Sequence, residues 1–135
     1  MNELIIRLLA TPQAAPVLRH AVREHLGPDG HPDAELCVTE LLANVVRHLG
    51  EGTPVTLRIS GRATRTRVEL TDPAPAARPV RREAAGDEES GRGLALLDAL
   101  SLRWGVTQGY GTKTVWCELD PGHSRHGRVA VITGG

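Results

Sequence analysis

Residues 33–49 carry the clearest periodic pattern in the sequence. Apolar residues recur there at spacings of three and four, the period of an α-helix with one buried face, and Gly50 supplies a helix stop. A helix of this kind is stable only where a second layer of secondary structure covers its apolar stripe. The stripe consists of Val38, Leu41, Leu42, Val45 and Leu49.

The rest of the chain predicts a sheet as that second layer. Strands are expected at residues 3–9, 55–60, 65–71, 102–107 and 112–119, and further helices at 14–26 and 93–100. The second and third strands flank Gly61-Arg62 as a hairpin. Because strands and helices do not alternate regularly, the order predicts an α+β fold, a two-layer α/β sandwich with helices on one face of a mixed, mostly antiparallel sheet.

Two segments depart from both periodicities. Residues 72–90 contain three prolines and a mixed charge run, which predicts a long loop of the kind that serves as a functional lid or a linker. The residues after Pro121 lack any pattern and are expected to fray. The chain is therefore expected to hold one domain, residues 1–121, and a flexible C-terminal tail, residues 122–135.

Composition restricts the partners. Sixteen basic residues balance sixteen acidic ones, so no net field draws the chain to nucleic acid or to an anionic membrane. The apolar runs are far shorter than the roughly 20 residues of a membrane span. Cys37 and Cys117 lack metal-ligand spacing and are expected to be buried free thiols, which favours the cytoplasm.

The polar face of the 33–49 helix is the first candidate site. Glu40, Asn44 and His48 follow one another at four-residue intervals with Arg47 beside them, so all four share one face. A solvated helix surface explains this pattern. Alternatively, a carboxylate and an amide one turn apart could converge on one metal-bound ligand.

Two further features can each be interpreted in structural or in functional terms. Asp72 ends a strand before Pro73, either as a turn residue or as a carboxylate that faces a pocket and accepts from an amine or a cation. Gly91 and Gly93 precede a helix, either as a flexible loop end or as an anion cradle formed by backbone N–H groups of the first turn. No P-loop or Rossmann fingerprint occurs in the sequence.

Taken in chain order, four segments resemble the histidine-kinase-like ATPase (GHKL) superfamily over residues 3 to 120. More narrowly, they resemble its single-domain branch of anti-sigma-factor serine kinases and actinobacterial ATP-binding regulators. The segments are Glu40-Leu-Leu-Ala-Asn44-Val-Val-Arg-His48, Val68-Glu-Leu-Thr-Asp72, Gly91-Arg-Gly-Leu-Ala-Leu-Leu97 and Gly111-Thr-Lys-Thr-Val-Trp116.

The resemblance implies an ATP site with Mg²⁺ between the helices and the lid. Asn44 would coordinate Mg²⁺, Glu40 would act as general base, and Asp72 would accept from the adenine amino group. Arg47 and His48 would lie beside the cofactor on the same helix face. The phosphates would be held by the segment Gly91, Arg92, Gly93 and Leu94, and Thr114, or alternatively Thr112, would support the adenine side.

The resemblance also implies a function. The chain would be a serine/threonine kinase that phosphorylates an anti-anti-sigma partner of the STAS type or acts on a sigma factor, and a homodimer is compatible with this branch. The alternative is a non-catalytic nucleotide-binding module that sequesters a protein partner. The prolines that follow Asp72 match the actinobacterial branch and replace the glycines common elsewhere in the superfamily.

Overall fold

One antiparallel sheet forms the centre of the molecule. The computed structural model describes residues 3–27, 29–61, 64–73 and 95–121. Within these residues the strand order is β1-β2-β3-β5-β4, and all four pairings are antiparallel. The strands are β1 (Glu3–Ala10), β2 (Thr53–Gly61), β3 (Thr66–Asp72), β4 (Arg103–Gly109) and β5 (Thr112–Leu119).

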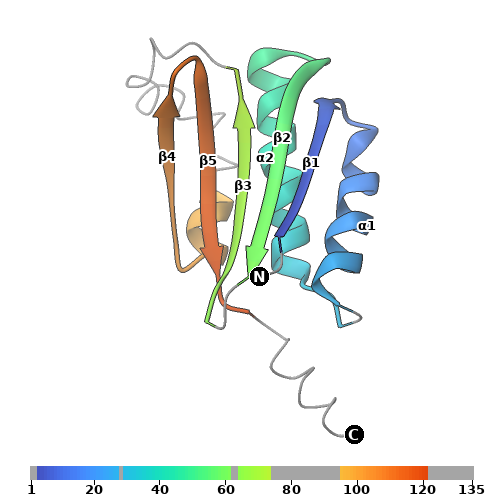
Figure 1. Ribbon diagram of the computed structural model, residues 1–135, viewed down its shortest axis with the longest axis vertical. Coiled ribbons are helices and arrows are strands. Elements are labelled where there is room, and N and C mark those ends of the chain that lie inside the picture. The colour runs from blue at the N-terminus through green and yellow to red at the C-terminus, as the bar shows by residue number, and fades with distance from the viewer. Residues whose placement is uncertain (1–2, 28, 62–63, 74–94, 122–135) are drawn as a thin grey trace, which may run out of the picture.

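Helices cover one face of this sheet. Figure 1 shows α1 (Ala14–Leu26), α2 (Pro32–Leu49) and the helical residues 95–100 on the same side, which we call the helix side, whereas no described helix covers the other, open face. The predicted two-layer α+β sandwich is thereby confirmed. Most of the predicted lid, the segment 91–94 and the predicted tail 122–135 lie outside the described residues.

The core lies between the sheet and the helices. The stripe of α2 is buried as expected, apart from Leu49 at its exposed end, and the strands alternate buried and exposed residues. Alternation of this kind places every second side chain of a strand on the helix side. The largest fully buried aliphatic side chains are Leu18, Leu42, Leu57, Ile59, Leu97 and Leu119.

The two cysteines meet inside this core. Cys37 of α2 and Cys117 of β5 are both free thiols with no exposed surface. The hydrogen bond with Cys37 and the burial of the side chain raise the pKa of Cys117. A buried, protonated thiol is inert, so this cysteine packs as a small apolar residue and is not a nucleophile.

A histidine starts α2. His31 Nδ1 accepts a hydrogen bond from the backbone N–H of Ala34 at 3.3 Å, and His31 Nε2 lies 2.9 Å from the carbonyl oxygen of Asp120. A carbonyl only accepts, so Nε2 donates in this contact while Nδ1 accepts. The ring, which is only 5% exposed, joins the start of α2 to the residue after β5. Pro32 at the first helical position explains why α2 starts one residue earlier than the pattern predicted.

Loss of this imidazole is expected to destabilise the fold. His31→Ala removes both hydrogen bonds and is expected to lower the free energy of unfolding by about 1–3 kcal/mol, measured by urea denaturation. His31→Asn is the matched control, because its amide can still cap the helix but is too short to reach Asp120. A loss as large in the asparagine variant as in the alanine variant would contradict the capping role.

The connection from α2 to β2 is short. Gly50 and Gly52 adopt φ angles of 101° and 92°, a region that residues with a side chain rarely occupy. The N–H of Gly52 donates to the carbonyl of Ala10, and the Thr53 hydroxyl donates to the carbonyl of Gly50 at 2.7 Å. The last turn of α2 is therefore held at the end of the sheet where β1 stops and β2 begins.

The open face carries an ion-pair network at the opposite end of the sheet. Glu118 accepts from Arg67 at 2.7 Å and from Arg103 at 2.9 Å, and both guanidinium groups stack on the ring of Trp116. The hydrogen bond from Arg103, followed by that from Arg67, lowers the pKa of Glu118. Gly105 leaves room for the Trp116 ring, because a Cβ atom at position 105 would lie 2.8 Å from that ring.

Candidate functional site

The polar face of α2 borders the core. Glu40 and Asn44 are half-buried, whereas Arg47 and His48 in the last turn are exposed. Arg47 Nη1 donates to Asn44 Oδ1 at 3.1 Å. Because a carbonyl oxygen has two lone pairs, the amide oxygen retains a second acceptor site beside this contact.

The end of this helix lies at one end of the sheet. The last turn of α2 leads through three residues into the start of β2, and Thr56 near that start pairs with Thr71 near the end of β3. Asp72 in turn pairs with Lys113 at the start of β5. The end of α2, the end of β3 and the start of β5 thus meet at one end of the sheet.

Asp72 is held in an ion pair there. The pattern of β3 buries Thr66, Val68, Leu70 and Asp72, so the carboxylate points to the helix side and is only 3% exposed. Lys113 Nζ lies 3.7 Å from Asp72 Oδ2, and the lysine side chain is 33% exposed. The two groups form an ion pair, and the carboxylate oxygens together offer about four lone-pair sites for hydrogen-bond donors.

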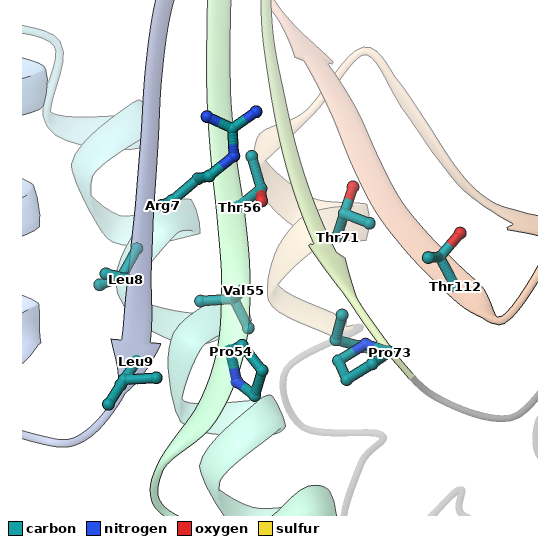
Figure 2. A pocket seen from close by; sticks show the side chains of 10 residues that line it. Arg7, Leu8, Leu9, Pro54, Val55, Thr56, Thr71, Pro73 and Thr112 are labelled. Carbon is teal, nitrogen blue, oxygen red and sulfur yellow. The ribbon is translucent and has the colours of Figure 1, made fainter.

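Thr112 and Thr114 lie on the other side of the sheet. Thr114 pairs with Thr71, and their hydroxyl groups are 2.7 Å apart on the open face. Thr112 has the same parity along β5 and also points to the open face, as Figure 2 shows. The two threonine side chains therefore point away from the face on which the Asp72 carboxylate lies, although Thr112 and Asp72 both line one hollow, and Lys113 occupies the position beside the carboxylate.

Sequence reasoning missed Lys113, although a signal for it existed. Along β5 the buried residues Cys117 and Leu119 fix the parity of the helix side, and Lys113 shares that parity. Strand alternation alone would have placed the lysine, and not the threonines, on the core face.

A hollow of about 490 Å³ lies on the open face near the same end of the sheet. Figure 2 shows Arg7, Thr56, Thr71 and Thr112 around it. Among the predicted site residues that the structure describes, Asp72 and Thr112 contribute to its lining. The hollow is thus separate from Glu40 and Asn44, which lie on α2 on the helix side of the sheet.

The predicted phosphate segment leads into a helix as expected. Gly91, Arg92, Gly93 and Leu94 lie outside the described residues, but residues 95–100 that follow are helical. Leu97 is fully buried in the core, and Trp104 Nε1 donates to Asp98 Oδ1 at 2.9 Å. These contacts fix the helix on the helix side of the sheet.

The donor set fits Mg²⁺ bound through a nucleotide. Among the described residues no group of three or more His, Cys, Asp or Glu side chains is placed to hold a metal ion. Mg²⁺ is usually bound by one or two protein oxygens together with phosphates and water, and not by a complete protein cage. The half-buried Asn44 amide beside Glu40 provides oxygens of this kind.

The described part of the chain contains no helix with the length and apolar character needed to cross a membrane.

Three comparisons relate the chain to known proteins. A family model described as a histidine kinase-like ATPase domain matches residues 8–117. The uncharacterized protein SCO4941 of Streptomyces coelicolor is 48% identical over 83 residues, which are 60% of this chain and 79% of that protein. The structure of the RsbU and RsbW domains of Rv1364c from Mycobacterium tuberculosis matches with a TM-score of 0.63 at 20% identity. This match covers 89% of this chain and 32% of the Rv1364c chain, and it shows a shared fold.

Proposed function

The chain belongs to the histidine kinase-like ATPase domain family, and from this membership we propose that it binds ATP with Mg²⁺ and acts as an anti-sigma-factor-type serine/threonine kinase. Its substrate is an anti-anti-sigma partner of the STAS type. The observation that carries the proposal is that the last turn of α2, the helix that bears Glu40 and Asn44, meets the end of the sheet where the buried carboxylate of Asp72 lies on the helix side.

The residues take the following roles. Asp72 accepts from the adenine amino group, and Asn44 holds Mg²⁺, which when bound neutralises phosphate charge. Glu40 accepts the proton of the attacking serine hydroxyl. Arg47 and His48 extend the site along α2, and the segment 91–94 receives the phosphates with backbone N–H groups at a helix start.

Two observations support the regulatory assignment and the location. The fold shared with a chain that contains an RsbW domain agrees with the motif resemblance to anti-sigma-factor kinases. The buried free thiols and the balanced charge agree with action on a protein partner in the cytoplasm, without nucleic acid or membrane contact.

One contact favours a second candidate function. The guanidinium of Arg47 occupies one lone pair of the Asn44 amide oxygen, the atom that a metal ion would need. A chain that keeps this contact when nucleotide binds would act as a non-catalytic module that sequesters its partner. Transfer of label from [γ-³²P]ATP to STAS-type proteins distinguishes the two, because only the kinase labels the partner.

Calorimetry tests the nucleotide site. Wild-type protein is expected to bind MgATP, and Asp72→Asn is expected to weaken binding about tenfold or more through loss of a charged acceptor. Asn44→Ala is expected to remove the gain in affinity that Mg²⁺ provides, measured with and without EDTA. Thr56→Val, on the open face of β2, is the control and keeps wild-type affinity. Wild-type MgATP affinity in both the Asn44 and the Asp72 variants would refute the assignment.

A further inference from the structure

A row of polar side chains ends the helix side of the sheet. Asp72 of β3 pairs with Lys113 of β5, which pairs with Gln108 of β4, and the shared register points all three to the helix side. The preceding row is apolar and consists of Leu70, Val115 and Val106. Val106 is 48% exposed although its parity is that of the core face. Leu70 of this row is buried, so the exposed apolar side chain that lies near the donor and the acceptor is that of Val106.

Such a surface suits a planar base. The exposed Val106 side chain can contact the ring, while the polar row meets one edge of it. The Asp72 carboxylate only accepts hydrogen bonds, and the Lys113 ammonium only donates them. With 3.7 Å between Nζ and Oδ2, the two groups can address neighbouring atoms on the same edge of one base.

We propose that Lys113 is a specificity-determining residue of the nucleotide site, whose ammonium donates to ring atom N1 of a 6-aminopurine while Asp72 accepts from its amino group. In adenine the donor amino group is directly adjacent to the acceptor N1, which is the order that the carboxylate and the ammonium require. This inference rests on the proposed function, since it presupposes that the site binds ATP.

A purely structural role for the lysine makes a different prediction. A carboxylate that is 3% exposed requires a counter-ion, and Lys113 provides one. If neutralisation of Asp72 were its only role, removal of the ammonium would weaken all purine nucleotides alike. A hydrogen bond to N1 would instead be lost only with nucleotides that possess this acceptor.

An analogue that lacks N1 separates the two roles. Calorimetric titrations of wild-type protein and Lys113→Met compare MgATP with Mg-1-deaza-ATP, in which a C–H group replaces N1. Wild-type protein is expected to bind the analogue about tenfold more weakly than ATP, the typical loss for a hydrogen bond to a charged group. The methionine variant is expected to bind ATP about tenfold more weakly than wild type and to bind the two nucleotides equally.

Each other outcome contradicts the proposal. Equal affinity of the wild type for ATP and the analogue would overturn it, and this comparison needs no variant and thus no assumption about folding. A methionine variant that keeps the wild-type ratio would leave Lys113 as a counter-ion only, and tighter binding of GTP than of ATP would refute the 6-aminopurine assignment. If wild-type protein binds no ATP at all, the proposed function fails as well, which distinguishes that result from failure of the lysine role alone.

Discussion

Replacement of Glu40 by glutamine is expected to lower phosphoryl transfer to the STAS-type partner about 100- to 10,000-fold, the usual contribution of a positioned general base. Glutamine keeps the size and the hydrogen-bonding oxygen of the side chain but cannot take up a proton at neutral pH. MgATP affinity should stay near that of the wild type, because this carboxylate acts on the attacking hydroxyl and not on the nucleotide. Label transferred from [γ-³²P]ATP measures the rate, and calorimetry measures the affinity.

Glu35→Gln is the matched control for this change. Glu35 lies on the same helix but forms an ion pair with Arg23 at 2.8 Å, away from the proposed site. Loss of that surface pair should leave transfer unchanged. Transfer that survives in the Glu40 variant, or falls equally in both variants, would remove Glu40 from its role as base.

Truncation of Leu57 to alanine is expected to lower the free energy of unfolding by about 2–5 kcal/mol. The side chain is fully buried in β2, between β1 and β3 and beneath α2. A cavity at this position removes apolar contacts that the surrounding sheet cannot restore by collapse. Urea denaturation monitored by circular dichroism measures the loss.

Ile5→Ala provides the comparison for Leu57→Ala. Ile5 lies on the open face of the neighbouring strand β1 and is 49% exposed, so its truncation should cost less than half as much. Similar losses for the two variants would mean that the open face is buried in solution.

The helices and strands were largely predictable because local pattern determines them. The apolar stripe and Gly50 placed the end of α2, and β5 was predicted with its observed bounds. The start of α2 was harder to predict from the sequence, because its N-cap is a histidine whose second hydrogen bond reaches Asp120. No local signal connects residues so far apart in the sequence.

The site was predictable in part. Glu40 and Asn44 share the expected helix face, and Asp72 is a buried carboxylate at the end of a strand. The ion pair of Asp72 with Lys113 depends on the register of β3 against β5, which comes from pairing across the long segment between these strands. The roles proposed for Gly91, Arg92, Gly93 and Leu94 remain predictions.

The position of Trp116 on the open face also determines what the fluorescence of this chain reports. The sequence contains two tryptophans, and β4 places Trp104 on the helix side, hydrogen-bonded to Asp98. Emission from a Trp116→Phe variant would thus arise on the nucleotide side alone, and emission from a Trp104→Phe variant on the opposite side. The two variants thereby supply separate optical signals for the two faces of one sheet.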